Sequence, residues 1–322
     1  MKVQKTKKVS RILIANFIGL TLLIFFASLA TADNAFSKVY TFGIIGDVGQ
    51  YATDLTFLQS SLHESDIKNL IMVGDNAPNI ATSSATYPAI WNSWIDEFNF
   101  MAVAVGNHNQ GYKREMDYFK MPGDFYSIVP ENDLLIIVLN SDEENKTRIE
   151  EQMKFIQDQL ESANQKMILI AFHHPPADVG PKHTWKEKKS FFLKLVPILK
   201  KFKTKIDAIL VGHEHVATFV DFDGIPLFVS PSVVGPREGK YYDKYYRELE
   251  TKATNKWVYT GKINRDWLKL EVNTDDDSML FSYINIDKKN RSDCSIVITS
   301  NVNAQSDNKR YLLQDNCQKN SL

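Results

Sequence analysis

The chain has 322 residues, 43% of them apolar and 24% charged, which excludes a low-hydrophobicity disordered polypeptide and allows one large globular domain. Its 38 basic and 39 acidic residues give a formal net charge of −1. This balance lacks the excess of positive charge that marks nucleic-acid-binding domains, so no nucleic-acid partner is expected.

The first 32 residues are typical of an export signal. A basic start without acidic residues precedes the apolar stretch Ile12–Ala30, and Ala30-Thr31-Ala32 fits the small-residue pattern for cleavage before Asp33. Cleavage would leave 33 basic and 39 acidic residues, a net charge of −6. We therefore expect a protein exported to the periplasm or the extracellular space and free of the membrane. The alternative is an uncleaved membrane anchor through residues 12–30.

Short apolar runs alternate with segments of helical spacing through the first two thirds of the chain. Each run is of strand length and lacks polar alternation, as strands buried on both faces do. The five runs are Val39–Ile45, Leu70–Val73, Phe100–Val105, Met167–Phe172 and Ile206–Val211. Apolar stripes predict helices between them, through Leu55, Leu58 and Leu62, through Met153, Ile156 and Leu160, and through Phe192, Leu195 and Leu199. The alternation predicts a layered α/β fold.

The last third of the chain has the pattern of an antiparallel sheet. Asp223-Gly224 is a hairpin signal. Further on, Leu268, Leu270 and Val272 alternate with polar residues, and a turn then leads into the apolar run Met279–Ile286. We expect one domain over residues 37–290 and a C-terminal extension over residues 291–322.

The only two cysteines, Cys294 and Cys317, lie in this extension. In an exported protein such a pair predicts a disulfide that ties the extension to the domain. Two unrelated thiols are the alternative, because sequence alone leaves cysteine pairing open.

Metal-binding residue types follow all five apolar runs. In α/β sheets, ligands bind beyond the carboxyl ends of the strands, and five of the seven histidines lie at these ends. The motifs, in chain order, are Gly46-Asp47-Val48-Gly49, Gly74-Asp75-Asn76, Gly106-Asn107-His108-Asn109, His173-His174-Pro175-Pro176 and Gly212-His213-Glu214-His215. Oxygen and nitrogen donors without thiolate suit Zn, Fe or Mn, and one carboxylate can bridge two such ions.

This order of motifs resembles the calcineurin-like metallophosphoesterase superfamily, and the first two motifs are most similar to its purple acid phosphatase branch. The resemblance spans about Tyr40 to Ile286. It implies a four-layer α/β/β/α sandwich with two mixed β-sheets. It also implies a metal-dependent phosphoesterase that hydrolyses small phosphate esters with a metal-bridging hydroxide as the nucleophile, and it favours phosphomonoesters over phosphodiesters. Together with the export signal, this predicts an exported enzyme.

The resemblance also implies roles for seven residues. Asp75 would bridge two divalent or trivalent ions of Fe, Zn or Mn. Asp47 and His215 would complete the protein ligands of the first ion. The ligands of the second would be Asn107, His173 and His213. His108 would be the catalytic residue that holds phosphate and protonates the leaving oxygen.

The sequence departs from the family pattern around the first ion. Gly49 stands where many members have a histidine ligand, and Pro78 stands where purple acid phosphatases have a tyrosine ligand. Gln50, Tyr51 or water would have to take that place. A binding protein on the same scaffold, without catalysis or with a single ion, is therefore the alternative function.

Overall fold

The computed structural model describes residues 39–48, 55–77, 86–108, 112–179, 183–232, 256–260, 266–300, 311–314 and 317. All of them belong to one compact unit, Val39–Leu322. The predicted export signal lies outside the described residues, as do Gly49, Gln50, Tyr51 and Pro78.

The first of two mixed sheets has the strand order β14-β13-β12-β11-β1-β2-β3 within the described residues. Its first three strands in sequence are parallel to one another: β1 (Val39–Ile45), β2 (Asn69–Val73) and β3 (Asn99–Ala104). The others are antiparallel to their neighbours: β11 (Asp266–Asn273), β12 (Ser278–Asn285), β13 (Arg291–Thr299) and β14 (Tyr311–Leu313). The first three predicted runs thus form adjacent strands, with bounds within one residue of those expected.

The second sheet has the strand order β10-β8-β9-β7-β6-β5-β4 over the same described residues. Its central strands are parallel: β5 (Leu134–Val138), β6 (Met167–Ala171), β7 (Ala208–Val211) and β9 (Ile225–Val229). Antiparallel strands flank them: β4 (Tyr126–Glu131), β8 (Thr218–Phe222) and β10 (Lys256–Thr260). The predicted hairpin is present, since Asp223 and Gly224 join β8 to β9 with positive φ angles of 54° and 88°.

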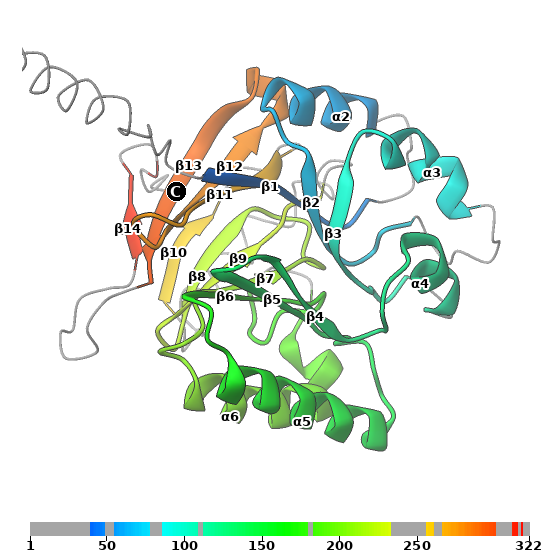
Figure 1. Cartoon of the computed structure of the whole chain (residues 1–322), viewed down its shortest axis with the longest axis vertical. Coiled ribbons are helices and arrows are strands. Elements are labelled where there is room, and N and C mark those ends of the chain that lie inside the picture. The colour runs from blue at the N-terminus through cyan, green and yellow to red at the C-terminus, as the bar shows by residue number, and fades with distance from the viewer. Residues whose placement is uncertain are drawn as a thin grey trace, which may run out of the picture. The chain divides into compact units, whose positions relative to one another are not determined.

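Helices cover the outer faces of both sheets, which gives the four layers that the sequence predicts (Figure 1). Beside the first sheet lie α2 (Leu55–Glu64), α3 (Thr86–Ile95) and α4 (Lys113–Phe119). Against the second lie α5 (Lys146–Ser162) and α6 (Lys189–Lys201). Two single turns of 3₁₀ helix, η2 (Trp185–Lys188) and η3 (Ile286–Lys288), complete the elements described.

The apolar strands are continuous in sequence because both of their faces are buried. Along β5, Leu134, Ile136 and Val138 join the core between the sheets, whereas Leu135 and Ile137 join the core beneath α5 and α6. Between the sheets, the rings of Phe228 from β9 and Phe281 from β12 stack with centroids 4.0 Å apart. This apolar packing holds the two sheets face to face, so that the loops after their parallel strands meet at one edge.

The C-terminal strands extend the first sheet, and the predicted disulfide between Cys294 of β13 and Cys317 is present. Among the described residues, no helix is both long enough and apolar enough to cross a membrane.

Candidate metal centre

All six predicted metal ligands lie at the edge where the two sheets meet. Asp47, Asp75 and Asn107 follow the parallel strands β1, β2 and β3, while His173 and the pair His213 and His215 follow β6 and β7. Because these strands are parallel within each sheet, their carboxyl ends come together. A backbone hydrogen bond also joins the first two of these loops, since Asp47 N–H donates to the carbonyl of Gly74 at 3.0 Å.

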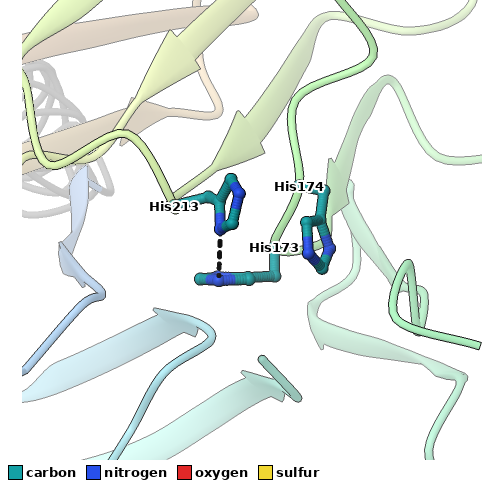
Figure 2. Close-up of side chains that lie close together, drawn as sticks. All are labelled: His173, His174 and His213. Carbon is teal, nitrogen blue, oxygen red and sulfur yellow. Dashed lines mark hydrogen bonds between the residues drawn. The ribbon is translucent and has the colours of Figure 1, made fainter. Parts of the chain in front are cut away.

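His173 is the centre of one group of donors. Its Nδ1 lies 2.9 Å from the carbonyl oxygen of Val73, which fixes a proton on Nδ1 and turns Nε2 towards the site. Around Nε2 lie Asn107 Oδ1 at 3.0 Å, His213 Nδ1 at 3.2 Å and Asp75 Oδ2 at 3.3 Å. Figure 2 shows the rings of His173 and His213 meeting through these nitrogens, with His174 beside them. These four residues are the ones expected around the second ion.

Asp47 and His215 make up the other side of the site. The buried Asp47 Oδ2 accepts the backbone N–H of His213 at 2.8 Å, and Oδ1 lies 3.3 Å from His215 Nε2. Oδ1 accepts no hydrogen bond from any residue that the structure describes. Asp75 lies between the two groups, because single ligand atoms of Asp47, Asp75 and His173 all fall within 4.8 Å of one another.

Four of the six residues adopt left-handed backbone conformations that side chains other than glycine rarely occupy. The φ angles are 52° at Asp47, 51° at Asp75, 74° at His213 and 59° at His215. Such conformations cost about 1–3 kcal/mol each and collect at functional sites. The strain is a sign that the chain gives up stability to aim these side chains at one point.

Glycines make room for this convergence. A methyl group on Gly212 would lie 2.8 Å from Asp47 Oδ2, and one on Gly74 would lie 2.5 Å from His173 Nδ1. At Gly106 the methyl group would lie 2.1 Å from the Asp75 carboxylate. The glycine in three of the motifs is therefore required by close packing against the ligand of another strand.

Carboxylates and imidazoles are electrostatically coupled in the site. Within the described part of the chain, the ionic partners of the buried Asp47 and Asp75 are imidazoles. Burial opposes ionisation of Asp75, but the charge of His173 and its hydrogen bond hold the pKa of that carboxyl far below its usual range. Burial likewise opposes a charge on His173, but Asp75 raises its pKa to about 9. Burial and the neighbouring His173 strongly lower the pKa of His213.

The donor set fits metal ions of the Zn, Fe or Mn type. Two buried carboxylates, an amide oxygen and three imidazoles converge, and one buried carboxylate oxygen lacks a hydrogen bond among the described residues. A buried charge of this kind is costly unless it is paired or coordinates a metal. Hard oxygen and borderline nitrogen donors without thiolate match these ions.

The profile of the calcineurin-like phosphoesterase family matches residues 40–217, more than half of the chain. This chain belongs to the calcineurin-like phosphoesterase family. It is therefore a hydrolase that acts on phosphate esters, as its sequence predicts. No curated protein sequence matches it.

Three solved structures share the fold of this phosphoesterase. GAP50, described as the anchor in the inner membrane complex of Plasmodium, has a TM-score of 0.60 at 12% identity, over 80% of this chain and 87% of that one. PhoD has a TM-score of 0.57 at 12% identity, over 82% and 70%. The purple acid phosphatase PPD1 from yellow lupin (Lupinus luteus) seeds has 0.55 at 14%, over 82% and 54%. At these identities the likeness shows the fold alone.

A second group of residues around the phosphoesterase site was not predicted. Ser141 follows β5 three residues after its last residue, and its hydroxyl lies 2.9 Å from His174 Nδ1. Asp142 next to it pairs with Lys188 at 2.7 Å. The pKa of His174 is lowered, mainly because burial disfavours the charged imidazolium form. The sequence does contain a signal for this group of residues. The polar residues Asn140-Ser141-Asp142 follow an apolar run of the same form as the other five.

Proposed function

We propose that this phosphoesterase hydrolyses small phosphate esters outside the cytoplasm at a two-metal centre, with monoesters preferred to diesters. The observation that carries the proposal is the convergence of six residues with oxygen and nitrogen donors on one sheet edge, four of them in strained backbone conformations. Asp47, Asp75 and His215 would hold one ion. Asp75, Asn107, His173 and His213 would hold the other.

Two ions bound there would neutralise the phosphoryl oxygens and lower the pKa of a water nucleophile. The chain's own task is to keep the ligands in place. His173 Nδ1–H donates to Val73, and the backbone N–H of His213 donates to Asp47. These bonds fix the ring and the carboxylate before substrate arrives, so little reorganisation is needed on binding.

The position of His108 supports its proposed role as a proton donor. Its backbone N–H donates to Asp75 Oδ1 at 3.0 Å, while its imidazole Nδ1 lies 3.7 Å from Asp75 Oδ2. The side chain is 31% exposed, unlike the buried rings of His173 and His213. A partly exposed imidazole next to Asp75 would be able to give a proton to the leaving oxygen of a bound substrate.

The disulfide between Cys294 and Cys317 supports export, because such bonds form and persist in oxidising compartments. The alternative, a binding protein without catalysis, would not need all six donors and His108 to stay together. GAP50's description as an anchor concerns that protein only, since the likeness shows the fold alone.

The test is hydrolysis of p-nitrophenyl phosphate and of its bis-ester by chelator-treated protein, with Zn, Mn or Fe added back. We expect activity only with metal, and a higher kcat/KM on the monoester. Full activity after exhaustive metal removal would refute the two-metal proposal. A lack of activity with every ion, together with stoichiometric metal binding, would favour the binding protein.

His108→Ala tests the proton transfer. General acids contribute about 10²–10⁴-fold, and an alkoxide leaving group needs the proton far more than p-nitrophenolate does. We therefore expect most of that factor to be lost on an alkyl phosphate and much less on p-nitrophenyl phosphate. The matched control is His63→Ala, because His63 pairs with Glu97 on the surface at α2. Equal losses on both substrates with both ions bound would refute a proton-donating role.

A further inference from the structure

The connection between β6 and α6 carries a histidine and a glutamate to the metal centre. His183 Nδ1 lies 3.1 and 3.2 Å from the two oxygens of Glu187. Glu187 Oε2 lies 3.3 Å from His213 Nε2, and the rings of His183 and His213 are 4.0 Å apart. Neither residue belongs to the strand-end motifs. No role for either residue is predicted from the sequence.

Several bonds hold this connection in place. The backbone N–H of His183 donates to Glu214 at 3.2 Å, and that of Trp185 donates to Asp178 at 3.0 Å. At the other end of η2, Lys188 pairs with Asp142 at 2.7 Å. The Glu187 carboxylate is therefore presented to His213 from a fixed turn, although its side chain is 42% exposed.

The two ring nitrogens of His213 face opposite surroundings. Nδ1 points to the group around His173 Nε2, and Nε2 points to Glu187. A neutral imidazole carries one proton, so a lone pair on Nδ1 for a metal ion leaves the proton on Nε2. Glu187 Oε2 lies at the distance of an acceptor for that proton. Histidines that bind metals commonly donate their other N–H to a carboxylate, which orients the ring and makes it a stronger ligand.

We propose that Glu187 is a positioning residue for the metal centre: it accepts the Nε2–H of His213 and fixes Nδ1 of that ring as the metal ligand. The inference rests on the proposed two-metal function. His183 also contacts the carboxylate, with its Nδ1 3.1 Å from Glu187 Oε1. The competing arrangement has the proton on His213 Nδ1. His183, Glu187 and His213 Nε2 would then be ligands of a separate ion, and the chain would bind three ions.

Glu187 also has a local role that must be separated from this one. With Thr184 it forms a capping box at the start of η2, and the backbone N–H of Thr184 donates to Glu187 Oε1 at 3.4 Å. Glu187→Gln keeps a capping-box residue and an acceptor oxygen but removes the charge. Thr184→Ala removes the other side chain of the box and leaves the Glu187–His213 contact, so it is the matched control.

The experiment measures Zn²⁺ binding to the full chain after chelator treatment, by competition with a chromophoric chelator. We expect two ions in the wild type. In Glu187→Ala, one of them should bind about 10–100-fold more weakly, with a smaller loss in Glu187→Gln and none in Thr184→Ala. The visible absorption of one of two bound Co²⁺ ions should change in Glu187→Ala alone, and equal melting temperatures of the metal-free variants would show that all fold.

Three results would overturn the inference. Zinc affinity in Glu187→Ala equal to that in Thr184→Ala would show that the carboxylate serves only the turn. Three ions in the wild type and two in Glu187→Gln would show the separate ion. A wild type that binds no ion would refute the proposed function itself, and with it this inference.

Discussion

Gly106→Ala should disable the metal centre by pushing Asp75 out of position. An alanine methyl group at this site would lie 2.1 Å from both the backbone nitrogen and Oδ1 of Asp75, and 2.9 Å from its Cα. Non-bonded heavy atoms normally stay about 3.5 Å apart. The methyl group would meet backbone atoms and the short carboxylate of Asp75, and not the end of a flexible side chain that could move aside. Asp75 or the Gly106 loop must therefore shift by about 1 Å or more.

The size of the effect follows from the contacts that this shift breaks. Overpacking costs about 1–3 kcal/mol, and losing the hydrogen bond from His108 N–H to Asp75 Oδ1 costs about 1.5–3 kcal/mol, because the acceptor is charged. With partial relaxation we expect the free energy of unfolding to fall by about 3 kcal/mol, or the melting temperature by roughly 6–12 °C. A misplacement of about 1 Å at a reacting centre costs about 100-fold in rate.

The assay compares Gly106→Ala with Gly43→Ala by thermal unfolding, zinc affinity and kcat/KM on p-nitrophenyl phosphate. At Gly43 the added methyl group meets side-chain carbons of Leu62 at 2.9 Å, Leu70 at 3.0 Å and Ile67 at 3.3 Å. This control should lose stability but keep zinc affinity. Wild-type zinc affinity and kcat/KM in Gly106→Ala would refute the steric argument.

Three further predictions concern the bridge, the core and the disulfide. Asp75→Asn should lower the zinc content and the activity more than Asp47→Asn does, because Asp75 faces both donor groups; equal losses at unchanged metal content would refute its bridging role. Phe228→Ala should lower the free energy of unfolding in urea by about 3–5 kcal/mol, and a loss below about 1 kcal/mol would show that the sheets repack without the ring. Cys294 and Cys317 should resist thiol labelling in unfolded, unreduced protein, and labelling of either one would exclude the bond.

The architecture could be predicted from the sequence where burial alone decides the structure. The runs that became β1, β2, β3 and β6 were found within one residue at each end, because strands buried on both faces have no polar positions. The run predicted to begin at Ile206 begins as β7 at Ala208 instead. Asp207, just before it, accepts the backbone N–H of Ile168 through its side chain.

Other elements gave weaker signals. Strand β5 (Leu134–Val138) was missed because Leu139 and Asn140 follow it rather than a Gly or His, although its apolar run is as clear as the others. Helix α3 buries Tyr87, Trp91 and Trp94, a stripe at helical spacing that packs against β3 and α4. Pro88 within this segment weakens its helical signal.

The strand-end motifs could be predicted because residues that follow parallel strands meet at one edge of the sheet. The residues that surround these motifs could not be predicted in this way. Glu187 lies in η2, just before α6, and its carboxylate is 3.3 Å from His213 Nε2. No regular spacing in the sequence predicts this contact. The same holds for Ser141, which contacts His174 across the β5–β6 pair.

The short strand β14 has a consequence for solubility. It pairs with Ile296, Val297 and Ile298 of β13, a run of β-branched residues that would otherwise present unpaired amides and carbonyls at the margin of the first sheet. Such margins are templates for pairing between molecules. Strand β14 is only three residues long, and the disulfide between Cys317 and Cys294 holds it next to β13. The disulfide therefore limits exposure of this strand edge, and its reduction would favour self-association of the chain through β13.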